Sequence, residues 1–416
     1  MNSSIKDLLD IEIRPMMKQL GYRKAGGLFH RQNESFVYTV EFFTPHSATN
    51  DTFSICASIF SFDIANVTGY LSNSMNPKDL HGNHYTLYHK DIVDLNGGNS
   101  ICIKEYDKSL LSDFIRKALI NLDDFFKSIL DIDTLLQCIL ENGSGHQPFF
   151  CNNIIKYSLL TKRWGYAEEL IRKEKERRSD WSISTLWVEK HKELCQGDTG
   201  HRGFSVSWDS SLLGRRAASQ GVKIFSKEWD EHMSKYASTD LLYQENQSWI
   251  FDNIPNNIEG TLDYKDDSWD FMSAYYYRSG MVAAVSMKVK EILEDMNISK
   301  EEYTLIPIRI KDSNTQYYLM FIKSIGHNEI NFSNSLYKKI IGDDEYRKFA
   351  SYSEFSDSTE SYTIAFPVLP QKYAKRDLIY IQNGKETYMS ARLIKAFREA
   401  GIKGIEFNAI GSLRFI

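Results

Sequence analysis

Three histidines stand close together at His81, His84 and His89, in the segment HGNHYTLYH. Neutral imidazoles are common zinc ligands, so this spacing could belong to a metal site. The segment offers no cysteine and no acidic residue at a spacing that would complete the ligand set, and Asp91 and Asp94 do not supply it. We therefore expect ordinary loop histidines and a protein without a metal or other cofactor. The alternative is a metal-dependent enzyme that uses the His81–His89 loop, for example in phage defence.

Motifs of other catalytic classes are missing from the chain. There is no GxxxxGK[ST] phosphate loop, no GxGxxG after a strand and no GxSxG elbow. Ser144 is followed by His146 in NGSGHQP. A serine nucleophile needs a base that the fold places beside it, and adjacency in the sequence does not provide this. We expect a protein that is not an enzyme and has no catalytic residues.

Two segments of the second half combine carboxylates with large aromatic side chains. The first is LDYKDDSWDF, and the second runs from Asp343 to Tyr362. Aromatic rings supply contact area at protein interfaces, while carboxylates attract a basic partner. The simpler interpretation of either segment alone is a solubilising loop. The residues we expect to bind a partner are Asp266, Asp267, Trp269, Asp270, Asp344 and Glu345.

Composition restricts the class of protein. A chain of 416 residues is long for one hydrophobic core, so two domains are expected. The net charge of −5 argues against a nucleic-acid-binding protein that relies on bulk positive charge. The five cysteines form no CxxC pair and are typical of reduced thiols in a cytosolic protein. The start of the chain does not resemble a signal peptide, and no apolar run approaches the roughly 18 residues of a membrane span. We expect a cytoplasmic protein with no membrane partner.

The first half reads as a sheet followed by helices. Apolar residues alternate in Leu28–Arg31, Phe36–Phe43 and Thr52–Phe62, which predicts antiparallel strands. From Ser109 to Ile129 the apolar spacing becomes i, i+3, i+4, which predicts an amphipathic helix. Further helices are expected towards Leu194. This half is therefore predicted to be an α+β domain with a helical end.

A glycine-rich segment divides the chain. Three glycines lie in Gly197–Gly203, GDTGHRG, which predicts an exposed connector. The expected domains are residues 1–196 and 204–416. In the second, Met281–Met296 is predicted to be one amphipathic helix, and no repeat of fixed period is visible. The predicted fold class is α+β, with two domains that each have a mainly antiparallel sheet and packed helices.

The end of the chain predicts a strand, a helix and a closing strand. In Asp377–Phe407, Ser390 is a plausible helix N-cap and Gly401 a left-handed C-cap. The sequences SARLIKAFREA and GIKGIEF in this stretch, together with YYLMFIKSIGHNEINFSNS upstream, resemble the bacterial immunity protein family eleven. The resemblance begins near Asp263 and extends to the end of the chain. It implies a protein that binds a cognate polymorphic toxin stoichiometrically and neutralises it.

The first half carries a second resemblance. A helix, then GYRKAGGLFHRQ, then VYTVEFFTPHSATNDTFSICASIF is similar to a bacterial domain-of-unknown-function family found near toxin–immunity loci. No catalytic residues are assigned to that family, so the resemblance implies no chemistry. The matched positions are Gly21, Phe29, Arg31, Phe53, Ile55 and Ile59. The resemblance of the second half implies an immunity protein whose partner is a toxin protein, and the acidic segments would suit a basic toxin of the kind that attacks nucleic acid.

Overall fold

The structure is a computed structural model of the whole chain. It describes residues 8–25, 28–43, 52–68, 86–92, 101–102, 107–143, 148–177, 189, 192, 202–208, 221–224, 227–229, 231, 258–263, 269–274, 282–311, 313–340, 345–381, 386–408 and 412–416. The mixture of helices and several sheets confirms the α+β class. Two compact units are distinguished, one of Met1–Val67 and Met75–Trp181, the other of Thr68–Ser74 and Ser182–Ile416.

Unit 1 is built on an antiparallel sheet of order β1-β2-β3-β4-β5, with β6 paired to β4. The three strands predicted from alternation are confirmed as β2, β3 and β4. The strands are β1 (Arg23–Ala25), β2 (Leu28–Gln32), β3 (Phe36–Phe43), β4 (Thr52–Ser61), β5 (Thr86–Ile92) and β6 (Ile101–Cys102). The helices are η1 (Leu8–Ile13), α2 (Arg14–Gln19), α3 (Phe62–Thr68), α4 (Lys108–Ser128), α5 (Ile132–Asn142), α6 (Pro148–Leu160) and α7 (Trp164–Arg177).

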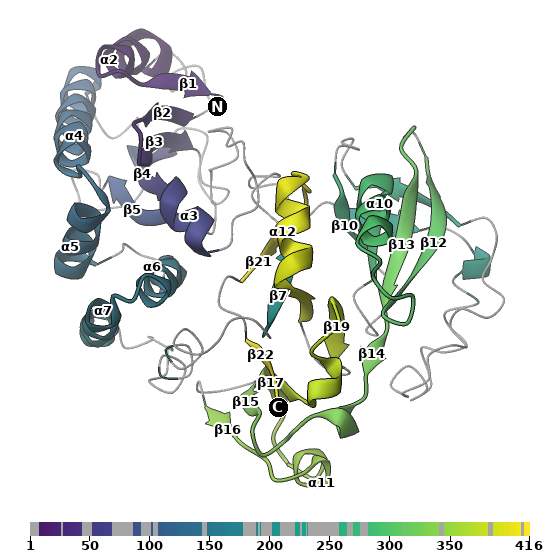
Figure 1. Cartoon of the computed structure of the whole chain (residues 1–416). Coiled ribbons are helices and arrows are strands. Elements are labelled where there is room, and N and C mark those ends of the chain that lie inside the picture. Colours follow the sequence, from purple (N-terminus) through teal and green to yellow (C-terminus); the bar gives the residue numbers. More distant parts are fainter. Residues whose placement is uncertain are drawn as a thin grey trace. The chain divides into compact units, whose positions relative to one another are not determined.

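Helix α4 is the predicted amphipathic helix, and Figure 1 shows it along one side of the sheet. Asp107 caps its start by accepting a hydrogen bond from the backbone N–H of Ser109 at 2.9 Å. On its inner side Asp123 is buried and accepts from Arg31 Nη1 at 2.6 Å. This ion pair joins α4 to β2, and the buried Phe126 ring packs against Tyr38 of β3.

Unit 2 contains a closed six-stranded barrel of order β10-β11-β13-β12-β9-β8. Most neighbours are antiparallel, but β12–β9 and β10–β8 are parallel. The barrel has an inner core of its own, to which Trp229, Tyr317 and Phe321 belong. The strands are β8 (Gly221–Ile224), β9 (Glu259–Leu262), β10 (Phe271–Ala274), β11 (Val282–Ser286), β12 (Tyr303–Ile310) and β13 (Tyr317–Ile322).

A seven-stranded sheet forms the second layer of unit 2, in the order β14-β19-β20-β7-β22-β18, with β21 also paired to β7. Helices α10 (Met287–Asp295) and α12 (Ala391–Glu399) share a hydrophobic core with barrel and sheet residues. Figure 1 shows α10 over the barrel and α12 over the sheet. The strands are β7 (Arg202–Trp208), β14 (Ser324–Ile325), β18 (Val368–Leu369), β19 (Leu378–Ile381), β20 (Thr387–Ser390), β21 (Ile405–Phe407) and β22 (Leu413–Phe415).

The third sheet is small and has the order β16-β15-β17. Short helices α11 (Tyr352–Ser356), η7 (His327–Glu329) and η8 (Gln371–Tyr373) belong to the same unit. The strands are β15 (Leu336–Lys339), β16 (Tyr346–Arg347) and β17 (Tyr362–Phe366).

Two sequence-based boundaries need correction. The helix predicted for Met281–Met296 is divided: Val282–Ser286 is strand β11, and the helix begins at Met287 with Ser286 as N-cap. A short apolar run is compatible with a helix face or with a buried strand, and periodicity does not distinguish them. The predicted connector also ends early, because Gly203 is buried inside β7 beside Leu413. Residues 197–201 lie outside the described residues.

A hairpin–helix motif occurs twice in unit 2. The first motif is β10–β11–α10, and the second is β19–β20–α12. Each begins with an aspartate, Asp270 or Asp377, whose carbonyl accepts from the backbone N–H of the capping serine at 3.0 Å. The serine hydroxyls, of Ser286 and Ser390, also donate to the aspartate carboxylates at 2.7 and 2.5 Å. Both helices contain nine residues.

The two motifs hold each other at their starting points. The backbone N–H groups of Asp270 and Phe271 donate to the carbonyl of Lys403, in the loop after α12, at 3.2 and 2.9 Å. The N–H groups of Asp377 and Leu378 donate to a carboxylate oxygen of Glu302, in the loop after α10, at 2.8 and 2.9 Å. The loop that follows each helix therefore stabilises the first strand of the other motif.

Candidate functional site

The six residues predicted to bind a partner are only partly described by the structure. Asp266, Asp267 and Asp344 lie outside the described residues. Trp269 is buried, with 2% of its surface exposed, and it packs in the barrel core. Its carbonyl accepts a hydrogen bond from the buried Tyr317 hydroxyl at 3.2 Å. The expectation that the Trp269 ring offers contact area to a partner does not agree with this burial. A large aromatic ring fits a core as well as an interface, and the sequence does not distinguish the two.

Asp270 has a structural position. Its Oδ1 accepts from the Ser286 hydroxyl at 2.7 Å, and its Oδ2 accepts from the backbone N–H of Lys403 at 3.0 Å. Both carboxylate oxygens therefore hold the first hairpin–helix motif against the loop after α12. These internal bonds explain why an aspartate suits this position without any external partner.

The second predicted segment folds around the small sheet and α11. Glu345 precedes β16, Glu354 lies in α11, and Glu360 precedes β17. Their side chains are 53%, 40% and 44% exposed, respectively. We call these three glutamates the acidic cluster. Lys339 pairs with both Glu345 and Glu360, and Arg347 pairs with Glu354 at 2.8 Å.

Hydrogen bonds and ion pairs favour the charged forms of Glu354 and Glu360. Hydrogen bonds from the Ala350 N–H and from Arg347 lower the pKa of Glu354, and bonds from Lys339 and the Tyr362 hydroxyl lower the pKa of Glu360. Both carboxylates are thus ionised at neutral pH. Each remains partly open to solvent, so a second cation could still approach it.

An aromatic cluster supports this part of the molecule from inside. Phe355 of α11 contacts several rings, at centroid distances of 5.1 Å to Tyr337 and 5.4 Å to Phe349. Tyr352, also in α11, is 48% exposed, and its ring lies 5.5 Å from that of His327. Burial lowers the pKa of His327 to about 4, so this imidazole is neutral at pH 7. The aromatic side chains that the sequence places among the acids are mostly a local core, and Tyr352 is the exposed exception.

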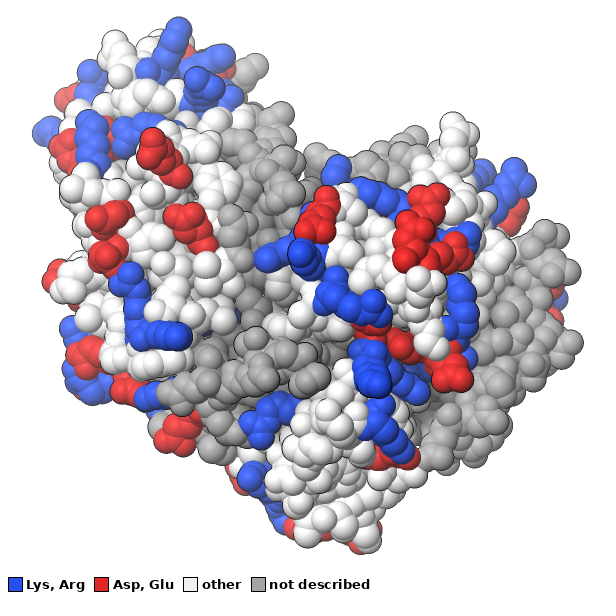
Figure 2. Space-filling model, in the orientation of Figure 1, with Lys and Arg blue, Asp and Glu red and all other residues white. Residues whose placement is uncertain are grey.

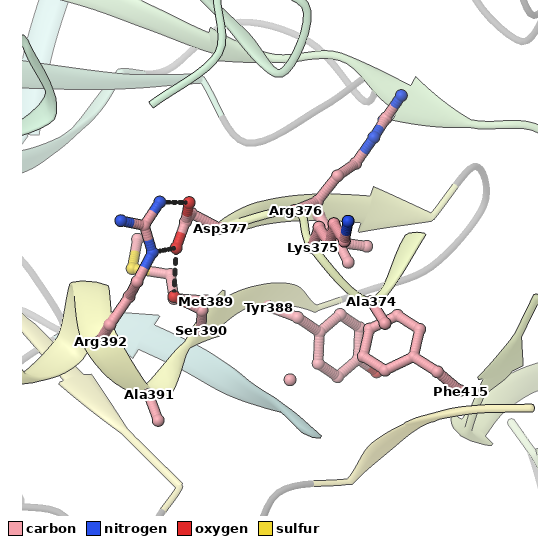
Figure 3. Close-up of a pocket in the computed structure, with 12 residues that line it drawn as sticks. Ala374, Lys375, Arg376, Asp377, Tyr388, Met389, Ser390, Ala391, Arg392 and Phe415 are labelled. Atoms are coloured by element: carbon pink, nitrogen blue, oxygen red, sulfur yellow. Dashed lines mark hydrogen bonds and ion pairs between the residues drawn. The ribbon is translucent and has the colours of Figure 1, made fainter. Parts of the chain in front are cut away.

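A pocket of about 420 Å³ opens at the start of the second hairpin–helix motif. Figure 3 shows the rings of Tyr388 and Phe415 on one side of it and an Arg392–Asp377 ion pair on the other. Six lining residues are apolar or aromatic and three are basic. The lining residues are Gly203, Ala374, Lys375, Arg376, Asp377, Ile379, Tyr388, Met389, Ser390, Ala391, Arg392 and Phe415.

The carboxylate of the pocket is already neutralised. Asp377 is buried and accepts from Arg392 Nε at 2.7 Å, from Arg392 Nη2, and from the Ser390 hydroxyl. This hydrogen bonding raises the pKa of Arg392 above its ordinary value. Lys375 and Arg376 form no ion pair with any residue that the structure describes. In the sequence, Lys375 and Arg376 are only part of a charged turn. The pocket could not be recognised there, because its aromatic wall comes from Tyr388 and Phe415, which lie further along the chain.

Most of the predicted histidine site lies outside the described residues. His81 and His84 are outside the described residues, and His89 lies in β5 opposite Ser58. Where the structure does describe the chain, no group of three or more His, Cys, Asp or Glu side chains is arranged to hold a metal ion. The described helices likewise include none with the length and apolar character needed to cross a membrane.

Comparisons with known proteins do not assign the chain to a family. A scan against protein-family models and a search of curated proteins both find no match. The two family resemblances therefore remain predictions from the motifs quoted above.

Proposed function

We propose that this chain is an immunity protein that binds a cognate toxin protein stoichiometrically and blocks its activity. The observation that carries the proposal is the acidic cluster, which presents three partly exposed carboxylates in the same region, around the small sheet and α11, as the half-exposed ring of Tyr352. Such a surface suits a basic protein partner. The resemblance of residues from Asp263 onward to an immunity family supplies the biological context.

The charge of the segment supports this choice of surface. Between Leu336 and Phe366 there are six acidic and four basic residues, so the segment keeps a negative balance after its own ion pairs form. Exposed ion pairs contribute little to stability, and their carboxylates can share bonds with incoming Lys or Arg side chains at small cost. Long-range attraction would mainly speed association with a basic toxin.

Tyr352 is the residue we expect to anchor the complex. Tyrosine is enriched among residues that dominate binding energy, because it buries a large area and loses little side-chain entropy. Its contacts with His327 and Phe355 hold the ring in place before a partner arrives. Neutralisation by coverage needs no bond making or breaking, so the mechanism makes no use of a catalytic group. A cytoplasmic site of action is part of the proposal.

The test is co-expression with the toxin encoded by the neighbouring upstream gene, followed by binding kinetics with purified proteins. The wild-type chain should form a one-to-one complex and restore growth. Tyr352→Ala should weaken binding by about 2 kcal/mol or more through faster dissociation. Glu345→Gln with Glu360→Gln should slow association, and the effect should shrink as salt rises.

Glu294→Gln with Glu399→Gln is the matched control, because these exposed glutamates also pair with lysines, Lys290 and Lys395, but lie on α10 and α12. The control should leave binding unchanged. If the wild-type chain neither binds nor protects, the immunity proposal fails for that toxin. If it protects while the Tyr352 and acidic-cluster variants bind normally, the binding surface lies elsewhere.

A further inference from the structure

The pocket beside α12 has a feature that the proposed function does not use. Its three basic side chains, Lys375, Arg376 and Arg392, face a single acidic one, Asp377. Arg392 and Asp377 neutralise each other through two hydrogen bonds. Lys375 and Arg376 belong to no ion pair of the described residues, although the charge of Arg376 also acts on the buried carboxylate of Glu302 and opposes the rise of its pKa.

The remaining walls are suited to a flat apolar group. Ile379 and Met389 are buried strand residues of β19 and β20, and Tyr388 adds a buried ring. Phe415, from β22 near the end of the chain, is partly exposed and lines the same space. Figure 3 places the Tyr388 and Phe415 rings on the side opposite the Arg392–Asp377 pair. Aromatic groups gain stability from offset or edge contacts with such rings.

Lys375 and Arg376 are more open to solvent than the apolar wall. Figure 3 shows Arg376 extending away from the two rings, and its guanidinium lies 5.0 Å from the ring centre of Tyr373. Lys375 is exposed. Figure 2 shows Lys and Arg side chains gathered over α12 and the adjoining part of unit 2. An anion near this pocket would therefore meet positive charge.

We propose that this pocket binds a small phosphate monoester with a flat ring, of the kind that a nucleoside monophosphate represents. A phosphate monoester carries about −1.5 to −2 charges at pH 7 and three strong acceptor oxygens, so Lys375 and Arg376 can both donate to it. Pockets of about 300–1,000 Å³ hold small organic ligands, and this one falls in that range. The flat ring lies against the partly exposed ring of Phe415, and the phosphate accepts hydrogen bonds from Lys375 and Arg376. The site is separate from the acidic cluster, so it does not depend on toxin binding.

The experiment uses the full chain and two probes, AMP and phenyl phosphate, titrated by calorimetry. Both probes should bind. Adenosine, which lacks the phosphate, and inorganic phosphate, which lacks the ring, should each bind at least about tenfold more weakly. Lys375→Ala with Arg376→Ala should reduce AMP affinity about tenfold or more. Affinity should also fall between pH 7 and pH 5, since the phosphate loses its second charge near pH 6.

Lys395→Ala is the control, because Lys395 is an exposed lysine of α12 that does not line the pocket. It should bind AMP as the wild-type chain does. Phe415→Leu tests the ring contact, and its thermal unfolding is measured first to show that it is folded. The proposal is overturned if neither probe binds the wild-type chain. It is equally overturned if the Lys375 and Arg376 double variant binds AMP as tightly as the wild type.

Discussion

Glu302 offers a sharp test of the contact between the two hairpin–helix motifs. Its side chain is buried, and one carboxylate oxygen accepts the N–H groups of both Asp377 and Leu378. In Glu302→Ala these two donors lose their acceptor in a buried place. Each unsatisfied donor costs about 1–3 kcal/mol, so we expect a loss of about 3 kcal/mol if some water enters. For a unit of this size that corresponds to roughly 6–12 °C in the unfolding midpoint.

Glu302→Gln separates the acceptor from the charge. Glutamine keeps one carbonyl oxygen, and a single oxygen accepts both bonds in the wild-type chain. Burial raises the pKa of Glu302, so the charged form is less stable in the folded state than in the unfolded state. The stability contribution of this group is therefore complete below the unfolded pKa near 4.5 and declines as pH rises through the higher folded value. We expect Glu302→Gln to gain stability relative to the wild type between pH 4 and pH 7.

The assay is denaturant unfolding combined with hydrogen exchange at the N–H of Leu378. Glu301→Ala is the control, because Glu301 is the exposed neighbour and bonds to Ser299 through its backbone N–H, which alanine keeps. The reasoning would be refuted if Glu302→Ala stayed within about 0.5 kcal/mol of the wild type. It would also be refuted if Glu302→Gln were as damaging as Glu302→Ala, since the charge and not the acceptor would then matter.

Three further predictions concern unit 2. In chemical unfolding, Gly404→Ala should lose several kcal/mol of stability and Gly401→Ala only about 1 kcal/mol. Both glycines have positive φ, but a Cβ at Gly404 would lie 2.0 Å from the Phe271 carbonyl oxygen, whereas a Cβ at Gly401 would have no atom within 4 Å. Equal losses would contradict this. Trp269→Ala should lose about 3–5 kcal/mol of stability, because it removes a buried ring from the barrel core. To separate binding from folding, toxin protection by this variant is compared with that by Trp269→Phe at the same folded fraction. Burial lowers the pKa of His327 to about 4, so between pH 6.5 and pH 4 the unfolded state binds more protons and stability should fall as the pH drops. His327→Phe should flatten this pH dependence of stability. An unchanged slope would exclude His327 as its source.

Local patterns were sufficient for part of the fold. The strands of unit 1 follow from alternating apolar residues, and α12 follows from its N-cap Ser390 and the left-handed Gly401. These signals arise within a few neighbouring residues, and the structure confirms them. The division of Met281–Met296 into strand and helix depended on barrel pairing with β10 and β13, which local periodicity does not report.

The repeated motif was missed for a related reason. Asp270 and Ser286 are separated by 16 residues, whereas Asp377 and Ser390 are separated by 13, so no fixed period exists. What the two motifs share is a hydrogen-bonding pattern. The candidate sites were similarly hard to foresee: the acids around Glu345 were recognisable as a cluster, but burial of Trp269 required the barrel. The pocket required Phe415 to meet residues near Lys375.

The hydrogen bonds that each loop makes to the other motif have a consequence for folding speed. The bond between Asp270 and the backbone of Lys403 joins residues 133 positions apart, and that between Glu302 and Leu378 joins residues 76 positions apart. Closing such long loops costs entropy before any contact offsets it, and chains dominated by distant contacts fold slowly. The first hairpin gains its anchor only when the loop after α12 has docked. We therefore expect barrel closure and docking of the last helix to occur in a single late kinetic step.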